Sequence, residues 1–338
     1  MRNYQVSRLK IVAAVLFGLF LTVGCSSNND PVVTPTNPTI VGIATTNQPT
    51  LTSLVAALNK FPDLVTILNS PGSYTVFAPT NTAFSTFLSG AGFANLDAVP
   101  LPLLREILLN HVVAGSYTST PSVGATVLTS GYLKTLGKGS ASATNTLSLY
   151  VNVGTTVRLN GVSNVTLANI AASNGVVHVV DAVIGLPTIV THTAANPNFS
   201  SLLAAVTSTG APFGNQSAVA TALTTNTTPL TVFAPTNAAF TAALAPGAWA
   251  NGATAAQVTR VLQYHVTSAG NVLAASLTQN QIIPMLATSP QLNTTIDLAG
   301  GAKVRDTQNL NANIIVTDVQ CSNGVIHAID RVLRRFII

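Results

Sequence analysis

Four of the five histidines in this 338-residue sequence come in repeated sequence contexts, His111 with His265 and His178 with His327, and the second pair stands near carboxylates that could support catalysis. His178 precedes Asp181 by three residues, and His327 precedes Asp330 by the same spacing. A hydrolase of the serine type needs a histidine that a carboxylate orients toward an activated serine. Both pairs lie in Val- and Ile-rich segments that predict strands, where residues three apart point to opposite faces. Because direct pairing within the strand is excluded and no Gly-x-Ser-x-Gly elbow is present, the sequence favours structural histidines.

Metal and cofactor chemistry would require clustered ligands. The sequence has no His-x-His, no His-Glu-x-x-His and no cysteine cluster. Asp297, Asp306 and Asp318 are too scattered to form a calcium loop. Gly300-Gly301 leads into no Lys-Ser/Thr helix start, so it predicts a turn and not a phosphate cradle. We therefore expect no cofactor, no metal site and no enzymatic activity.

The composition points away from nucleic acid. Only 7% of the residues are charged whereas 47% are hydrophobic, and three of the basic residues, Arg2, Arg8 and Lys10, stand at the N-terminus. A basic stripe interleaved with aromatic residues is the usual mark of a nucleic-acid-binding surface, and none is present. The length is enough for two domains of about 150 residues each. We expect a two-domain protein without a nucleic-acid partner.

Residues 1–24 have the three parts of an export signal. The basic N-terminal region is followed by an apolar run from Ile11 to Leu21, which is too short to span about 30 Å of hydrocarbon. Leu21-Thr-Val-Gly-Cys25 then resembles the lipobox of bacterial lipoproteins. A plain signal peptide is the alternative, but its cleavage site would not require a cysteine. We predict cleavage before Cys25 and membrane anchoring through lipid on that residue.

The residues after Cys25 predict a spacer. Positions 25–40 are rich in Ser, Asn, Thr and Pro and contain nothing from which to build a core, so they form a flexible tether. Ser26, where an aspartate would favour retention at the inner membrane, indicates an exported outer membrane lipoprotein, at the cell surface or on the periplasmic face. The other cysteine, Cys321, lies in an apolar strand pattern. We expect it to be a small buried side chain without a disulfide.

The rest of the chain contains one unit twice. Thr75-Val-Phe-Ala-Pro-Thr-Asn81 recurs from Thr231, and Ser173-Asn-Gly-Val-Val-His178 recurs with one change from Ser322. Between them His-Val recurs at the end of an apolar helical pattern, and a Ser-Leu-x-Ala-Ala segment recurs upstream. Four matches in one order indicate a duplicated domain. We place the two copies at residues 41–189 and 190–338.

The local patterns predict which elements position these motifs. Pro79 ends a short strand because it has no N–H to donate, and Thr80 or Asn81 is a suitable N-cap for the next helix. A helix from Leu101 carries an apolar stripe that ends at His111, and the second copy has the same stripe ending at His265. Asn-Gly before the last strand of each copy predicts a type I′ hairpin.

These motifs resemble the fasciclin, or FAS1, domain family from about Ile40 to the C-terminus. The first family motif resembles Thr75–Phe84 and its repeat, and the Tyr-His motif resembles Tyr264-His265 and, with a departure, Asn110-His111. The resemblance implies an α+β fold of two tandem domains, each a wedge-like β-sandwich with a cluster of helices. Of an acidic motif that some members carry before the last hairpin, only Asp318 matches.

The resemblance implies binding or adhesion at the cell surface. The expected partner is an unknown protein or polysaccharide outside the cell or in the envelope. A structural envelope protein that links the outer membrane to matrix polysaccharide is the alternative. The candidate structural or binding residues are Asn110, His111, Tyr264, His265 and Asp318. We expect each helix-end imidazole to be buried and to bond backbone near the Phe-Ala-Pro-Thr turn of its own copy, with Asn110 facing away.

Overall fold

The computed structural model describes residues 37–46, 49–210, 213–248, 251–288 and 291–334. The predicted signal peptide, Cys25 and most of the predicted tether lie outside these residues. We call residues 37–187 repeat 1 and residues 188–334 repeat 2. Among the described residues, no helix has both the length and the hydropathy needed to span a bilayer.

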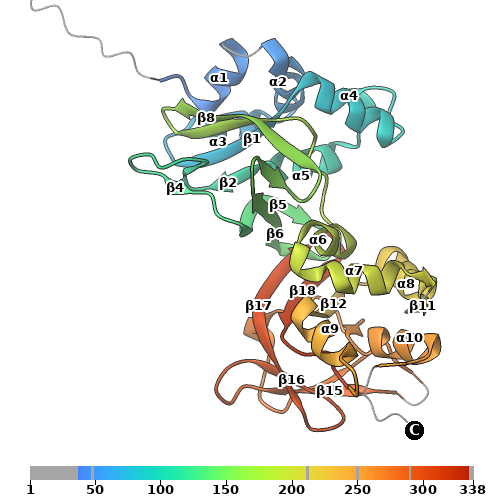
Figure 1. Ribbon diagram of the computed structural model, residues 1–338. Helices are drawn as coiled ribbons and strands as arrows, with labels where there is room; N and C mark the ends of the chain where they lie inside the picture. The colour runs from blue at the N-terminus through green and yellow to red at the C-terminus, as the bar shows by residue number, and fades with distance from the viewer. Residues whose placement is uncertain (1–36, 47–48, 211–212, 249–250, 289–290, 335–338) are drawn as a thin grey trace, which may run out of the picture. The chain divides into compact units, whose positions relative to one another are not determined.

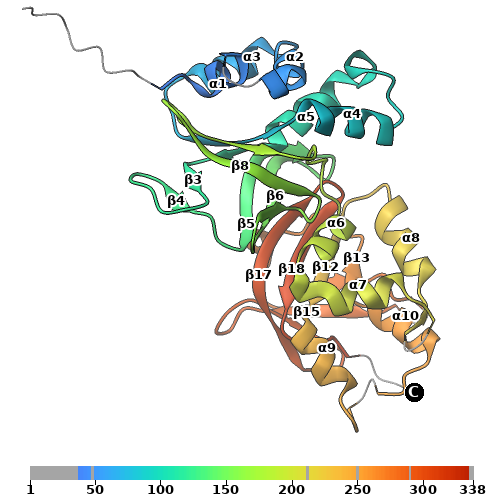
Figure 2. The ribbon, with the colours of Figure 1, turned by 45° about the horizontal axis from the view of Figure 1, so that its top comes forward.

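Repeat 1 begins with helices and ends with strands, as the sequence predicts (Figure 1). Its helices lie together on one side of the strands (Figures 1 and 2). The helical elements are α1 (Ile40–Thr46), η1 (Pro49–Leu51), α2 (Thr52–Leu58), α3 (Pro62–Asn69), α4 (Asn81–Gly90), η2 (Leu96–Ala98) and α5 (Leu101–Asn110). The strands are β1 (Tyr74–Pro79), β2 (Val112–Ala114), β3 (Tyr117–Thr118), β4 (Thr126–Val127), β5 (Gly131–Gly139), β6 (Ser142–Val153), β7 (Val157–Leu159), β8 (Ser163–Ala172) and β9 (Gly175–Val180).

Repeat 2 also has most of its helical elements in its first half and most of its strands in its second. Its helical elements are α6 (Ile189–Ala195), η3 (Pro197–Phe199), α7 (Ser200–Thr207), α8 (Ser217–Thr225), α9 (Asn237–Leu244), α10 (Ala255–Gln263) and η4 (Ala274–Ser276). Its strands are β10 (Thr209–Gly210), β11 (Gly214–Asn215), β12 (Leu230–Pro235), β13 (Val266–Thr267), β14 (Ile282–Pro284), β15 (Asn293–Asp297), β16 (Lys303–Arg305), β17 (Asn311–Cys321) and β18 (Gly324–Ile329).

The two repeats share their strand order. In repeat 1, strands β1-β2-β5-β6-β7-β8-β9 close into a barrel: β1 pairs in parallel with β9, and β2 pairs with β5 through Val113 and Thr135. In repeat 2 the corresponding strands form a seven-stranded sheet of order β13-β12-β18-β17-β16-β15-β14, and β12 pairs in parallel with β18. The α+β class and the two-domain organisation are thus as predicted.

Each repeat has two apolar clusters that follow from strand alternation. Val76 of β1 packs against the helices, whereas the next residue, Phe77, packs among the strands. Val232 and Phe233 divide in the same way in repeat 2. Because successive side chains of a strand point to opposite faces, one strand serves both clusters. This central strand therefore fixes the helices and the sheet relative to each other.

The turns confirm one local prediction and correct another. Thr80 caps α4, since its Oγ1 accepts a hydrogen bond from the N–H of Ala83 at 3.2 Å. The predicted type I′ turn is wrong in both repeats: the register makes Ser173 and Asn174 the turn residues of repeat 1 and the corresponding Ser-Asn pair those of repeat 2, and none of them has the positive φ that this turn requires. In repeat 1, Asn174 is held by contacts outside the hairpin. Its side chain instead accepts a hydrogen bond from the N–H of Ile40 and donates to the carbonyl of Leu68, so tertiary contacts set its conformation.

Hydrogen bonds also join the two repeats. Lys134 of β5 donates to Ser148 Oγ at 3.1 Å and to the carbonyl oxygen of Asp318 at 2.7 Å. The N–H of Gln320 donates to the same Ser148 hydroxyl at 2.9 Å. Strands β5 and β6 of repeat 1 therefore contact β17 of repeat 2.

Candidate functional site

His111 and His265 occupy equivalent places in their repeats, at the C-terminal ends of helices α5 and α10. Both are buried, with 2% of their surface exposed. The Nδ1 of His111 lies 2.7 Å from the carbonyl oxygen of Ile107, one turn back in α5, and its Nε2 accepts a hydrogen bond from the N–H of Ile184 at 2.9 Å. His265 makes the matching bonds to the carbonyl of Val261 and the N–H of Leu333, also at 2.7 and 2.9 Å.

These bonds fix the protonation of both rings. Because Nε2 accepts from a backbone N–H, the single proton of the neutral ring is on Nδ1, which donates to the helix carbonyl. In a charged ring Nε2 would also carry a proton, and its N–H would then face the backbone N–H and repel it. Burial lowers the pKa of His111 and of His265 to about 4, against a weaker opposing effect of the bond to the helix carbonyl. Both rings are therefore neutral at pH 7.

The predicted partner of these rings is wrong, although their predicted burial is confirmed. The imidazole does not bond near the Phe-Ala-Pro-Thr turn. It is the main-chain carbonyl of His111 that accepts from the N–H of Phe77, at 2.9 Å, and His265 and Phe233 repeat this contact. The ring itself connects the end of the helix to the segment that follows the last strand of the repeat.

Asn110 and Tyr264 precede these histidines, and both are fully buried. Asn110 donates to the carbonyl of Gly185 at 3.0 Å and accepts from Thr135 Oγ1 at 3.1 Å. The Oη of Tyr264 donates to the carbonyl of Asn293 at 3.0 Å, and burial raises the pKa of Tyr264 to about 12. The expectation that Asn110 faces away from the apolar stripe and is dispensable for stability is therefore wrong, because its side chain is buried and bonded. Strand β5 and the segment after β9 enclose the end of α5.

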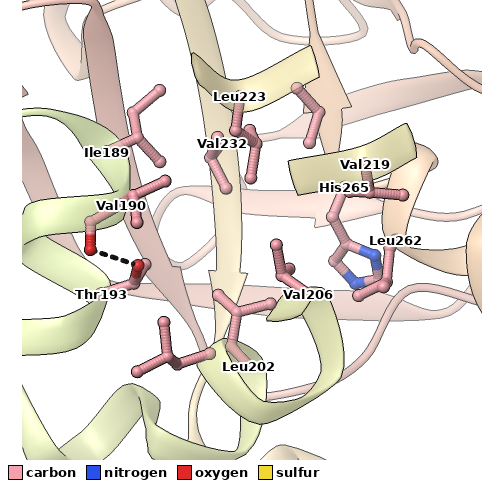
Figure 3. A pocket seen from close by; sticks show the side chains of 12 residues that line it. Ile189, Val190, Thr193, Leu202, Val206, Val219, Leu223, Val232, Leu262 and His265 are labelled. Carbon is pink, nitrogen blue, oxygen red and sulfur yellow. Dashed lines mark hydrogen bonds between the residues drawn. The ribbon is translucent and has the colours of Figure 1, made fainter. Parts of the chain in front are cut away.

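A small apolar cavity adjoins each helix-end histidine. Figure 3 shows the one in repeat 2, where His265 faces side chains of α6, α7 and α8. Its volume is about 20 Å³, and the cavity beside His111 in repeat 1 has the same volume. Such a space holds about one water molecule and no larger ligand. The environment of these histidines thus supports packing and not ligand binding.

His178 and His327, on the last strands, also bond only to backbone. The Nε2 of His178 lies 2.8 Å from the carbonyl oxygen of Tyr117, and its Nδ1 accepts from the N–H of Asn169 at 3.2 Å. His327 lies in the same way 2.8 Å from the carbonyl oxygen of Val272. Burial lowers the pKa of both histidines. These rings hold the loop after β2 or β13 against the sheet.

The carboxylates near these histidines bond elsewhere, as strand geometry predicts. Asp181 accepts from the N–H of Asn164 at 2.7 Å and from its side-chain amide at 2.8 Å. Asp330 and Asn313 form the corresponding contacts in repeat 2. Each aspartate therefore joins the ends of two neighbouring strands. Among the described residues, no three His, Cys, Asp or Glu side chains come together as a metal site would require.

Asp318 lies at a bulge of β17, with a positive φ of 57°. Its Oδ1 accepts a hydrogen bond from the N–H of Ala274 at 2.8 Å. Asn169 takes its place in repeat 1, with a φ of 61° and a bond of 2.8 Å from the N–H of Ser119. Because the neutral amide of Asn169 accepts the same backbone hydrogen bond as the Asp318 carboxylate, this contact requires an acceptor oxygen and not a negative charge.

The remaining histidine and the described cysteine are enclosed where the repeats meet. Neither ring nitrogen of His192 makes a hydrogen bond within the described part of the chain, and the ring meets Tyr132 edge-on at 5.5 Å. Burial, with a smaller effect of nearby Lys134, lowers the pKa of His192 to about 3. Cys321 is fully buried, as predicted, and burial raises the pKa of its thiol.

Comparison with known proteins agrees with the repeat structure. The fasciclin domain model matches residues 49–187 and again residues 197–335. Protein sll1483 of Synechocystis is 39% identical over 146 residues, which cover 43% of this chain and 72% of that protein. The cell surface glycolipoprotein MPB83 of Mycobacterium bovis is 42% identical over 81 residues, covering 22% of this chain and 34% of that protein.

A solved structure gives the same fold. It is a FAS1 domain pair from the insect cell adhesion molecule fasciclin I, and it matches with a TM-score of 0.51 at 20% identity. The match covers 85% of this chain and 97% of the domain pair. The duplicated motifs, the strand order shared by the two repeats and the two matches of the family model lead to one conclusion. This chain belongs to the fasciclin domain family and carries two of its domains in tandem.

Proposed function

We propose that this protein is a lipid-anchored adhesion protein of the bacterial surface, which binds an extracellular or envelope partner through its fasciclin domains. The observation that carries the proposal is the tandem domain pair itself, a match to the domain pair of a cell adhesion molecule. Because one fold can host many functions, the chemistry of the described residues must fit binding as well.

The four repeat-related histidines are buried and fit a structural role better than a catalytic one. His111, His178, His265 and His327 bond to backbone atoms inside the domains, which leaves them unable to meet a substrate. A catalytic site needs a reactive group aimed at an accessible position. The proposal therefore assigns binding and not catalysis to the surface of the domains.

The anchor follows from Leu21-Thr-Val-Gly-Cys25. Lipid on Cys25 would hold the protein at the outer membrane, and residues 25–40 would carry the domains clear of it. Wild-type protein produced in bacteria should incorporate a palmitate analogue and partition into detergent. Cys25→Ser should lose the label, whereas Cys321→Ala, which changes the buried thiol, should keep it. Labelling that survives in Cys25→Ser would refute the anchor.

Adhesion itself is tested with the full protein. Beads that carry it should retain soluble glycan or protein from envelope extracts in a saturable manner, compared with beads that carry heat-unfolded protein. Recovery only with insoluble envelope material would favour the structural alternative, a link between outer membrane and matrix polysaccharide. Equal retention on folded and unfolded protein would refute specific binding.

A further inference from the structure

Repeat 1 has a polar surface groove of about 440 Å³, away from the helix-end histidines. One wall is the end of the β8–β9 hairpin, including Ala171 and Ser173, and the other is the segment that carries β3 and β4, from Ser116 to Ala125. This segment stands apart from the barrel beside β5 and β8 (Figure 2). The volume is in the range of sites that bind small ligands.

Two small side chains leave the groove open at a place that is filled in repeat 2, as a comparison of the repeats shows. Thr75 Oγ1 bonds to Gly115 and Tyr117 on either side of Ser116, and Thr231 Oγ1 bonds in the same way on either side of Asn271. Ser116 and Asn271 are therefore equivalent positions.

Strand register gives the second pair of equivalent positions. Ala171 of β8 is paired with Val176 of β9, next to the residue pair that closes the hairpin turn. Gln320 of β17 is paired with Val325 of β18 at the same position relative to its own turn. In repeat 2 the side chains of Asn271 and Gln320 bond to each other at 2.9 and 3.1 Å. Where these two amides meet in repeat 2, repeat 1 has a serine and an alanine, and the space between its walls stays open.

The open groove is also accessible. In repeat 2 the turn at Ser322 is covered by repeat 1, because its carbonyl accepts from the N–H of Ala141 and from Ser140 Oγ, both at 2.9 Å. The equivalent residue of repeat 1, Ser173, is exposed. A ligand can therefore reach the hairpin end of repeat 1.

The lining of the groove defines the chemistry of a ligand. The hydroxyls of Ser73, Ser116, Ser122 and Ser173 face no hydrogen-bonding partner within the described part of the chain. Each hydroxyl can donate one hydrogen bond and accept others. The described residues that line the groove carry no charge, so nothing there compensates an ionic ligand.

We propose that this groove binds a neutral oligosaccharide, an inference that rests on the surface-binding function proposed above and names its site and ligand class. A sugar presents closely spaced hydroxyls that both donate and accept, and the four serines match that pattern. A peptide bound as an added strand would instead use main-chain groups and pockets for its side chains. The walls here are hydroxyls and small side chains.

The test transfers to repeat 1 the two amide side chains that meet in repeat 2, those of Asn271 and Gln320. Ser116→Asn with Ala171→Gln restores the two amides, and the backbone already accommodates them in repeat 2. Purified full-length protein is titrated with neutral hexasaccharides (malto-, manno-, cello- and β-1,3-gluco-oligomers) and with an oligouronate as the charged control. Wild type should bind at least one neutral hexasaccharide with a Kd of about 1 mM or tighter and should prefer it to the oligouronate.

The double variant should weaken this binding at least tenfold and keep the wild-type melting temperature. Ser85→Asn with Ala91→Gln makes the same changes at exposed positions on and after α4, away from the groove, and should bind like wild type. If the double variant fails to fold, the single variant Ala171→Gln, at an exposed position, replaces it.

Two outcomes would overturn the inference: no binding of any neutral hexasaccharide, or equal binding by wild type and the groove-filled variant. The envelope-extract assay separates this failure from that of adhesion. If wild type and the double variant retain the same extract component, adhesion stands and the groove is rejected as its site. If the retained component is a protein without glycan, the ligand is a peptide and not an oligosaccharide.

Discussion

The imidazole of His265 accepts a hydrogen bond from the backbone N–H of Leu333, 68 residues later in the chain. The same ring bonds to the carbonyl of Val261 in α10, so one side chain connects the end of the helix to the end of the repeat. His111 makes the same connection to Ile184. These two contacts therefore join distant parts of each repeat in its interior.

His111→Ala and His265→Ala should each destabilise their own repeat. Truncation leaves a buried N–H and a buried carbonyl without partners, and each unpaired group costs about 1–3 kcal/mol. Thermal unfolding combined with hydrogen exchange resolved by peptide will locate the loss. The opposite pattern, wild-type stability with abolished surface binding, would assign these histidines to a ligand site.

Asn110→Ala should also be destabilising, by about 1–3 kcal/mol, because the carbonyl of Gly185 and the hydroxyl of Thr135 lose a buried partner. Asn59→Ala is the matched control, since that asparagine is exposed at the end of α2. Urea denaturation of both variants measures the difference. Equal midpoints for the two variants would show that the bonds of Asn110 contribute nothing to stability.

Stability should fall as the pH drops from about 6.5 to about 4. Burial lowers the pKa of His111 and His265 to about 4 and that of His192 to about 3, from an ordinary value of 6.5. The unfolded chain therefore binds protons in this window that the folded chain excludes, which favours unfolding. Each such histidine contributes up to about 1.4 kcal/mol per pH unit.

Urea denaturation at pH 7, 6, 5 and 4.5 measures this slope. His192→Phe removes one titrating ring that makes no hydrogen bond within the described residues, and it should flatten the slope. The aspartates with lowered pKa values, Asp63 and Asp297, have an ordinary value of 3.8 and act mainly at lower pH. A free energy of unfolding that stays constant between pH 7 and 4.5 would contradict the prediction.

Gly175→Ala should destabilise repeat 1 by about 2–4 kcal/mol. Gly175 has a φ of +148°, and a Cβ there would lie 1.9 Å from the carbonyl oxygen of Tyr74 on the paired strand. Gly324 has the same relation to Leu230 in repeat 2. Gly185→Ala, where a Cβ meets nothing within 4 Å, is the control. Melting temperatures that match between Gly175→Ala and the control would mean that the parallel strands separate without penalty.

The sequence predicted those features that local chemistry determines. The Thr80 cap, the strand end at Pro79 and the burial of the stripe that ends at His111 depend on residues a few positions apart. The duplication was visible because both copies retain these motifs in order. Periodicity therefore sufficed for the elements, their order and the class of fold.

Features that depend on distant segments were missed. Helical periodicity placed Asn110 outside the apolar stripe, but α5 ends there and residues from β5 and the segment after β9 surround it. The turn at Asn174 differs from its local preference because Ile40 and Leu68 hold its side chain. An alignment of the two copies, with a serine opposite Asn271 and an alanine opposite Gln320, was the available signal for the groove.

The parallel pairing of β1 with β9 also constrains when repeat 1 can fold. Tyr74 lies beside Gly175, so the first strand acquires this neighbour only after about 100 further residues have been made. Contacts this distant along the chain raise the contact order and slow folding. A chain that emerges N-terminus first, from a ribosome or a translocation channel, can pair β1 with β2 early but must leave the other edge of β1 unpaired until β9 appears. Each domain therefore folds as one unit after its last strand is free, and a chain truncated before Gly175 keeps an unpaired strand edge open to aggregation.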